Sequence, residues 1–214
     1  MKKALMVWGG WDGHEPRECT ARFEPFLKEQ GFETTVSDSL EVFANKERML
    51  SYDLIVPCWT MGHLKPEEEA GLLEAVRAGS GIAGWHGGMG DAFRENTAFQ
   101  FMVGGQFVEH PGGIIPYKVN IVRPDDSIMD GIHDFPISSE CYYMHVDPSN
   151  EVLASTVFTG DACVWIEGCV MPVVWKRSYG EGRVFYSALG HVAADFDVPP
   201  CFEIMKRGML WACR

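Results

Sequence analysis

The first 85 residues alternate short apolar runs with segments of helical spacing, and this alternation restricts the fold more than any other feature of the chain. Apolar runs punctuated by Gly, Asp or Pro, as is typical of strands, cover residues 3–8, 32–37, 52–58 and 81–85. Pro16 and Pro66 each begin a helix between two of these runs, since a first helical turn does not need the N–H that proline lacks. Strands that alternate with helices form right-handed βαβ units. We therefore expect a doubly wound, parallel sheet.

The pattern changes after residue 105, where strand-like runs follow one another with only turns between them. These runs cover residues 116–122, 140–146, 152–158, 171–175 and 183–189. They predict an antiparallel extension and a last strand that returns to the main sheet, followed by a closing helix at 201–213. The expected fold is α/β, an open and mostly parallel sheet with helices on both faces. Residues 1–214 are predicted to form a single domain, because the length is that of one ordinary domain.

Composition argues against several classes of protein. The formal net charge of −12 leaves no basic stripe for phosphates, so we expect no nucleic acid partner and no membrane partner, and a small-molecule ligand instead. No apolar run approaches the roughly 18 residues of a membrane span, and the N-terminal run is too short for a secretory signal. Seven cysteines without a Cys-x-x-Cys pair argue against a disulfide framework and a zinc ribbon. We expect a cytoplasmic protein.

A glycine-flanked turn at residues 81–88 places one imidazole at a prominent position. The sequence Gly-Ile-Ala-Gly-Trp-His-Gly-Gly predicts a strand and a sharp turn with His86 at its apex, the geometry of a nucleophile elbow without a nucleophile. Acyl-enzyme chemistry is not expected there, whereas proton transfer, metal ligation and sugar binding all remain open. The glycine-rich loop at residues 9–13 lacks the G-x-G-x-x-G pattern, so no nucleotide cofactor is expected.

Ligands of open α/β sheets bind at the carboxyl ends of the strands, and in this chain those ends carry His and Trp. His86 and His191 follow strands at tight turns, which favours a functional role, and His14 precedes a helix N-terminus that could bind an anion or a hydroxyl. An indole can stack on the C–H face of a sugar, so the Trp residues predict a carbohydrate site, although each could instead fill the core. These candidate substrate-binding residues are Trp8, Trp11, Trp59 and Trp85.

Residues 140–146 contain the candidate carboxylate. Strand alternation puts Glu140 and Tyr142 on one face and His145 on the other. Glu140 could act as a base beside the Tyr142 phenol, or it could be an edge-strand charge. His110, in Val-Glu-His-Pro-Gly-Gly, and His145 are further candidates for substrate binding.

The histidines also raise the question of a metal. Three imidazoles and a carboxylate match the ligand chemistry of a divalent ion such as Zn or Mn, with His14, His86 and His191 as candidate ligands. The spacing, however, contains no local His-x-x-His or His-x-x-x-His pair. His63 and His133 are expected in solvated loops.

Four motifs occur in order along nearly the whole chain. They are Trp-His-Gly-Gly at 85–88, Val-Gly-Gly-Gln-Phe-x-x-His-Pro at 103–111, Ser-Glu-x-Tyr-Tyr-Met-His-Val-Asp at 139–147, and Pro-Val-x-Trp-x-x-x-Tyr-Gly-x-Gly-Arg-Val-Phe-Tyr-Ser-x-Leu-Gly-His at 172–191. Through them the chain resembles the ThuA-like family of trehalose utilisation. The resemblance implies a flavodoxin-like fold similar to that of class I glutamine amidotransferases. It also implies a role in the catabolism of trehalose or related disaccharides, on keto-sugars made by a partner dehydrogenase.

The chain departs from the amidotransferase pattern in two places. His86 stands where the elbow cysteine would be, and His191 is not followed by a glutamate two residues on, so glutamine hydrolysis is not expected. Our leading hypothesis is an enzyme acting on a sugar or keto-sugar, with His86 and His191 as acid/base groups or metal ligands and Glu140 as a supporting base. Metal-dependent hydrolysis or lysis of a glycosidic bond is a variant of it. The alternative is a non-catalytic carbohydrate-binding or regulatory domain. Apolar residues of the extension could form a homo-oligomer face or cover the sheet.

Overall fold

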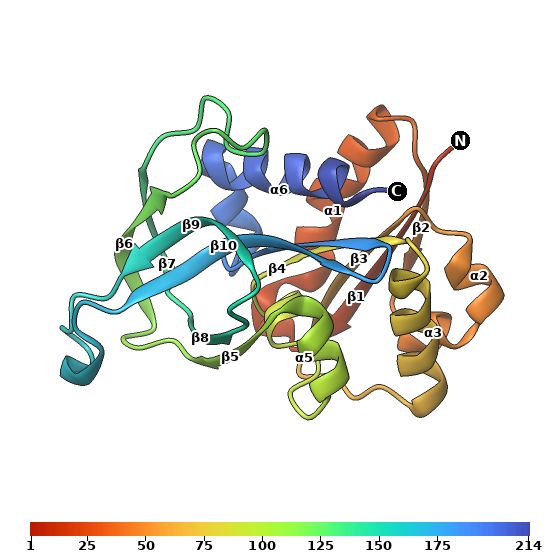
Figure 1. Ribbon diagram of the computed structural model, residues 1–214, viewed down its shortest axis with the longest axis horizontal. Helices are drawn as coiled ribbons and strands as arrows, with labels where there is room; N and C mark the ends of the chain where they lie inside the picture. Colours follow the sequence, from red (N-terminus) through yellow and green to blue (C-terminus); the bar gives the residue numbers. More distant parts are fainter.

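The computed structural model describes residues 1–214, and its main feature is a nine-stranded sheet in the order β2-β1-β3-β4-β11-β10-β9-β6-β7 (Figure 1). The first five strands in this order are parallel: β2 (Glu33–Ser37), β1 (Lys3–Gly10), β3 (Leu54–Thr60), β4 (Gly81–Trp85) and β11 (Gly182–Ser187). The other four are antiparallel: β10 (Val170–Tyr179), β9 (Glu151–Val157), β6 (Ile114–Ile121) and β7 (Phe135–Glu140). A separate two-stranded sheet pairs β5 (Gly105–Glu109) with β8 (Tyr143–Val146).

Helices cover both faces of the sheet. Figure 1 shows α1 (Pro16–Glu29) and α6 (Pro199–Ala212) on one face, and α3 (Pro66–Arg77) and α5 (Thr97–Val103) on the other, with the short α2 (Lys46–Leu50) beside α3. The one-turn α4 (His86–Gly90) follows β4 without a linker. The predicted α/β sheet with helices on both faces and an antiparallel extension is thereby confirmed.

Local sequence explains most of these elements. In α1, Cys19, Phe23 and Leu27 recur every four residues and are buried, which is the spacing that turns one helix face toward the sheet. All five residues of β4 are buried, because small and apolar side chains let helices pack on both sides of it. The predicted return of the last strand is also confirmed, since β11 pairs in parallel with β4.

The predicted strand at 140–146 is wrong. The chain leaves one sheet at Glu140, where β7 pairs with β6, and enters another at Tyr143, where β8 pairs with β5. Glu140, Cys141 and Tyr142 are buried one after another, so the run of buried residues continues through the turn and the sequence pattern could not show the break. The structure also adds β5, β7, α2 and α5, which the sequence pattern did not predict.

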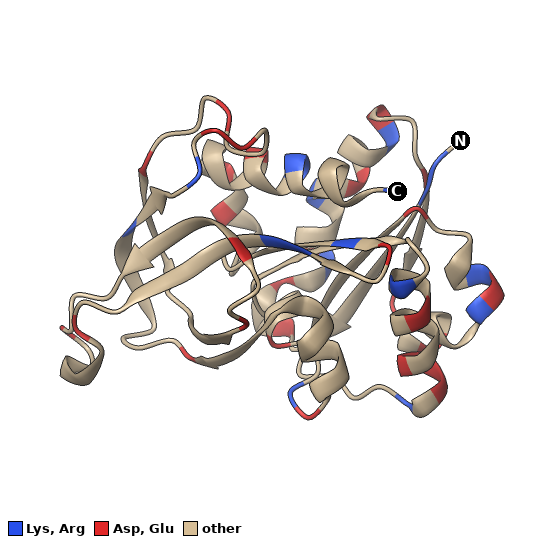
Figure 2. Ribbon diagram, viewed as in Figure 1, with Lys and Arg blue, Asp and Glu red and all other residues tan.

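The surface agrees with the acidic composition. Figure 2 shows Lys and Arg spread among the more numerous Asp and Glu, without a continuous basic stripe in this view. None of the helices has both the length and the apolar character needed to cross a bilayer.

Candidate metal centre and cleft

Three histidines meet at the carboxyl edge of the parallel strands. His14 follows β1, His86 follows β4, and His191 follows β11, and all three are buried. Their ring centroids are 4.8 Å apart for His14 and His86, 5.1 Å for His14 and His191, and 5.3 Å for His86 and His191. Parallel strands end at the same edge of a sheet, which is why residues so far apart in the sequence lie together.

The turn at His86 is strained and is closed by glycines. His86 has a φ of 43°, in the left-handed region that a side chain rarely adopts. A Cβ on Gly87 would lie 2.4 Å from His14 Cε1, and one on Gly88 would lie 2.8 Å from Cys58 Cα. The two glycines therefore allow the elbow to approach the neighbouring strand and the His14 ring.

Glu140 reaches the three histidines from the antiparallel extension. Its Oε2 lies 3.1 Å from His86 Nε2, 3.2 Å from His191 Nδ1 and 3.8 Å from His14 Nε2. One donor atom from each of the four residues falls within a group whose members are all within 4.8 Å of one another. Burial would raise the pKa of Glu140, but the three imidazoles outweigh it and hold the pKa well below its usual range.

Hydrogen bonds from outside the cluster orient the rings. His86 Nδ1 donates to the Ala188 carbonyl at 2.8 Å, and His14 Nδ1 lies 2.8 Å from Thr60 Oγ1. The carbonyl of Ala188 can only accept, so the proton of neutral His86 is on Nδ1 and the lone pair of Nε2 points into the cluster. Such outer partners are typical of metal-ligating histidines, because they fix the tautomer and the direction of the free nitrogen.

Burial and the Glu140 carboxylate act in opposite directions on the pKa values of His86 and His191. Burial lowers the pKa of His86 to about 4, against the opposing effect of Glu140, so at neutral pH its Nε2 lone pair faces a carboxylate oxygen. His191 Nδ1 is buried and makes no hydrogen bond. Burial alone would lower the pKa of His191, but Glu140 outweighs it and raises the pKa. Three imidazoles and a carboxylate, with the lone pair of His86 Nε2 free to bind a cation, fit Zn or another first-row divalent ion.

A cleft of about 340 Å³ opens onto the cluster. Its lining residues are Trp11, His14, Thr60, Met61, Asp91, Arg94, Phe107, Val108, Glu109, His110, Glu140 and Tyr142. The Tyr142 ring stacks on His86 with centroids 3.8 Å apart, and the Trp11 ring lies edge-on to His14 at 4.7 Å with 47% of the residue exposed. His110 Nε2 lies 3.8 Å from Glu140 Oε1, and 40% of the His110 side chain is exposed.

Asp91 and Arg94 form a part of the cleft that the sequence analysis missed. Arg94 donates to the two carboxylate oxygens of Asp91 at 2.6 and 2.7 Å, and Asp91 is buried while Arg94 is half-exposed. Gln106 Nε2 adds a longer contact to Asp91 at 3.3 Å. The only sequence signal was the Asp-x-x-Arg spacing directly after the elbow.

Several predicted substrate-binding residues lie elsewhere. Trp85 is 1% exposed and packs against Phe23 and Phe196, so it belongs to the core. Trp8 and Trp59 are half-buried and do not line the cleft. His145 is exposed on β8, in a different hollow. Successive residues of a strand point to opposite faces, so a residue beside a functional one points away from it. Among the predicted indoles, only Trp11 lines the cleft.

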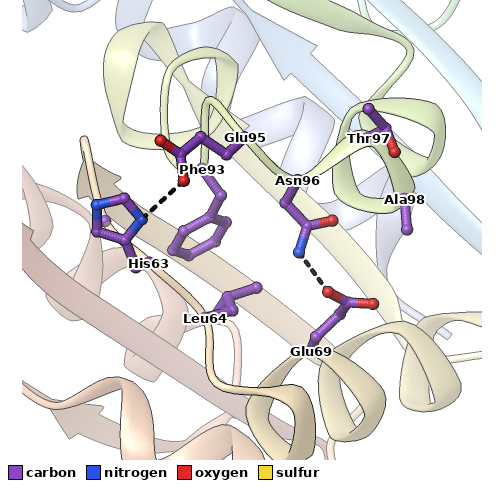
Figure 3. A pocket seen from close by; sticks show the side chains of 9 residues that line it. His63, Leu64, Glu69, Phe93, Glu95, Asn96, Thr97 and Ala98 are labelled. Atoms are coloured by element: carbon purple, nitrogen blue, oxygen red, sulfur yellow. Dashed lines mark hydrogen bonds and ion pairs between the residues drawn. The ribbon is translucent and has the colours of Figure 1, made fainter.

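A second hollow, of about 310 Å³, contains none of the four cluster residues (Figure 3). His63 lies at its edge, 3.6 Å from Glu95 and largely exposed, as expected for a solvated loop. Asn96 donates to Glu69 at 2.6 Å across its floor. Its two carboxylates, Glu95 and Glu69, are thus each paired within the hollow.

Comparison with known proteins gives a family and a fold. The model of the ThuA family, described as trehalose utilisation, matches residues 3–212. A ThuA-like protein from Bacteroides uniformis has a TM-score of 0.81 at 17% identity, with 99% of this chain and 91% of that chain covered. A ThuA-like protein from Parabacteroides merdae has a TM-score of 0.76 at 18% identity, with 99% of this chain and 89% of that chain covered. These neighbours fit a flavodoxin-like, amidotransferase-like fold. No match was found among curated proteins.

Proposed function

The chain belongs to the ThuA family of trehalose utilisation, and on this premise we propose that it is an enzyme acting on a sugar or keto-sugar at a divalent metal ion held by His14, His86, His191 and Glu140. One observation carries the proposal. Four donor groups converge within 4.8 Å, with the Nε2 lone pair of His86 and the unbonded Nδ1 of His191 both facing the Glu140 carboxylate. A buried arrangement of this kind is costly unless a cation lies between the groups.

In this proposal the four cluster residues are metal ligands, and a residue that lines the cleft acts as the acid or base. A bound divalent ion supplies polarisation of a sugar carbonyl or hydroxyl oxygen and lowers the pKa of a bound water. His86 is nearly sealed from solvent, whereas His110 is partly exposed with Nε2 directed toward Glu140. His110 is therefore the imidazole best placed to exchange a proton with a substrate in the cleft.

The cleft suits a neutral sugar. Trp11 offers an exposed indole face for stacking, and the Asp91–Arg94 pair presents donors and acceptors without net charge. The volume of about 340 Å³ lies at the lower end of the roughly 300–1,000 Å³ typical of small-molecule pockets, which favours one sugar ring at the centre. A carbonyl on that ring would acidify the neighbouring C–H, so that a base could remove its proton. Because a dehydrogenase makes such a carbonyl by oxidising a sugar hydroxyl, we propose that a sugar dehydrogenase supplies the substrate.

The test follows deuterium exchange by NMR in 3-keto disaccharides incubated in D₂O with the metal-loaded protein. We expect exchange next to the carbonyl, its loss after chelation, and its recovery after the metal is restored. His86→Ala should remove both the metal and the exchange, while the exposed His63→Ala variant keeps both.

Equal exchange by loaded and chelated protein would refute the metal role. Shift perturbations of the sugar without any exchange would instead support the alternative, a carbohydrate-binding or regulatory domain without catalysis.

A further inference from the structure

The hairpin formed by β9 and β10 ends in an apolar tip that projects from the body at the end of the sheet opposite α2 (Figure 1). Trp165, at this tip, is 81% exposed, and Val164 and Val170 beside it are also exposed. The tip is held in place by backbone hydrogen bonds from Phe158 N to the Cys169 carbonyl at 3.1 Å and from Gly168 N to the Phe158 carbonyl at 2.9 Å. The indole is therefore presented to solvent on an ordered support.

A hollow of about 430 Å³ lies beside the same hairpin. Its walls are mostly apolar and include Ile115 and Tyr117 of β6 and Phe158 and Ile166 of the hairpin. None of the four metal-binding residues lines it. A hollow of this size and lining accepts an indole-sized apolar group.

We propose that Trp165 and the hairpin tip dock into this hollow on a second copy of the chain. The two copies are related by a two-fold axis, and the tip of each inserts into the hollow of the other. A two-fold interface uses each surface twice, and it requires that a projecting group and its receptor lie on one patch of the monomer. The tip and the hollow meet this requirement, because residues of the same hairpin form both.

The area of exposed apolar surface agrees with a second copy as the occupant. Trp165, the exposed valines and Ile114 at the start of β6 leave on the order of 600 Å² of apolar surface per chain, near the roughly 800 Å² that each partner buries in a standard interface. Residues 157–170 carry only two charged groups, Asp161 and Glu167. Lys118 lines the hollow, but its Nζ is already paired with the Asp134 carboxylate at 2.8 Å, so the fit of a second copy rests on apolar area and not on charge.

The test measures the mass of the full chain by sedimentation velocity over a range of micromolar concentrations. We expect a dimer for the wild-type protein, and a dissociation constant at least about 30-fold higher for Trp165→Ser, as for other buried aromatic anchors of interfaces. Phe101→Ser is the matched control, because Phe101 is an exposed aromatic residue on α5, outside the hairpin and the hollow.

Two outcomes would overturn the proposal. One is a wild-type protein that stays monomeric throughout. The other is a dimer that Trp165→Ser leaves unchanged, which would place the interface on another surface. Because Trp165 makes no contact with the metal-binding residues, circular dichroism and metal content should be those of the wild type in every variant.

Discussion

Asp195 is a buried carboxylate that joins two of the segments carrying the candidate ligands. It accepts a hydrogen bond from the backbone N–H of His191 at 2.9 Å and another from Ser139 Oγ at 2.6 Å. Ser139 immediately precedes Glu140, so one side chain sets the relative position of His191 and Glu140. Asp195 touches neither the other ligands nor the cleft, and its role is that of a positioning residue.

Replacing Asp195 by Asn removes the charged acceptor and keeps the volume. We expect Asp195→Asn to weaken metal affinity by about 10- to 100-fold, the usual effect of losing an outer hydrogen bond to a metal ligand. Competition titration against a chelating indicator measures this affinity, with the exposed Asp134→Asn as control. A lower melting temperature with unchanged affinity would show that Asp195 contributes to stability only.

The position of a tryptophan at a strand end determines whether its side chain packs in the core or lines the cleft. Trp85 is the last residue of β4 and points into the core, whereas Trp11 lies beyond the end of β1 in a loop. In the sequence, Trp85 ends an apolar run, and Trp11 follows another after two glycines. Only the direction of each side chain separates the core residue from the cleft residue.

This difference makes the two indoles a matched pair. Trp85→Ala should reduce the free energy of unfolding by about 3–5 kcal/mol, because it empties a fully buried site. Trp11→Ala should change it by no more than about 0.5 kcal/mol while weakening sugar binding. Urea unfolding and calorimetric titration measure the two effects. Loss of stability in Trp11→Ala with sugar binding intact would contradict the assignment of Trp11 to the substrate.

The helices and strands could be predicted where the local spacing of apolar residues, Gly and Pro determines them. Residues 81–85 form a strand with the predicted bounds, and Pro16 and Pro66 begin helices. The meeting of His14, His86 and His191 also follows from topology, because parallel strands share one carboxyl edge. The contacts of Glu140 and Arg94 could not be predicted in this way, since they depend on the path of turns between two sheets.

At the scale of the whole molecule, the antiparallel extension completes a site that the parallel half begins. The parallel strands supply three imidazoles, and the extension supplies Glu140 from β7, the far edge strand of the nine-stranded order. The extension also supplies Tyr142, which covers His86. The nucleophile elbow of this fold thus holds a histidine whose free nitrogen faces a carboxylate from the other half of the chain.

The most direct test is anomalous X-ray scattering from crystals of the zinc-loaded protein, with data collected on both sides of the zinc absorption edge. We expect one strong anomalous peak per chain, bounded by His14, His86, His191 and Glu140, and no peak there in crystals of Glu140→Gln grown under the same conditions. An absent peak, or a peak bound by other residues, would contradict this expectation.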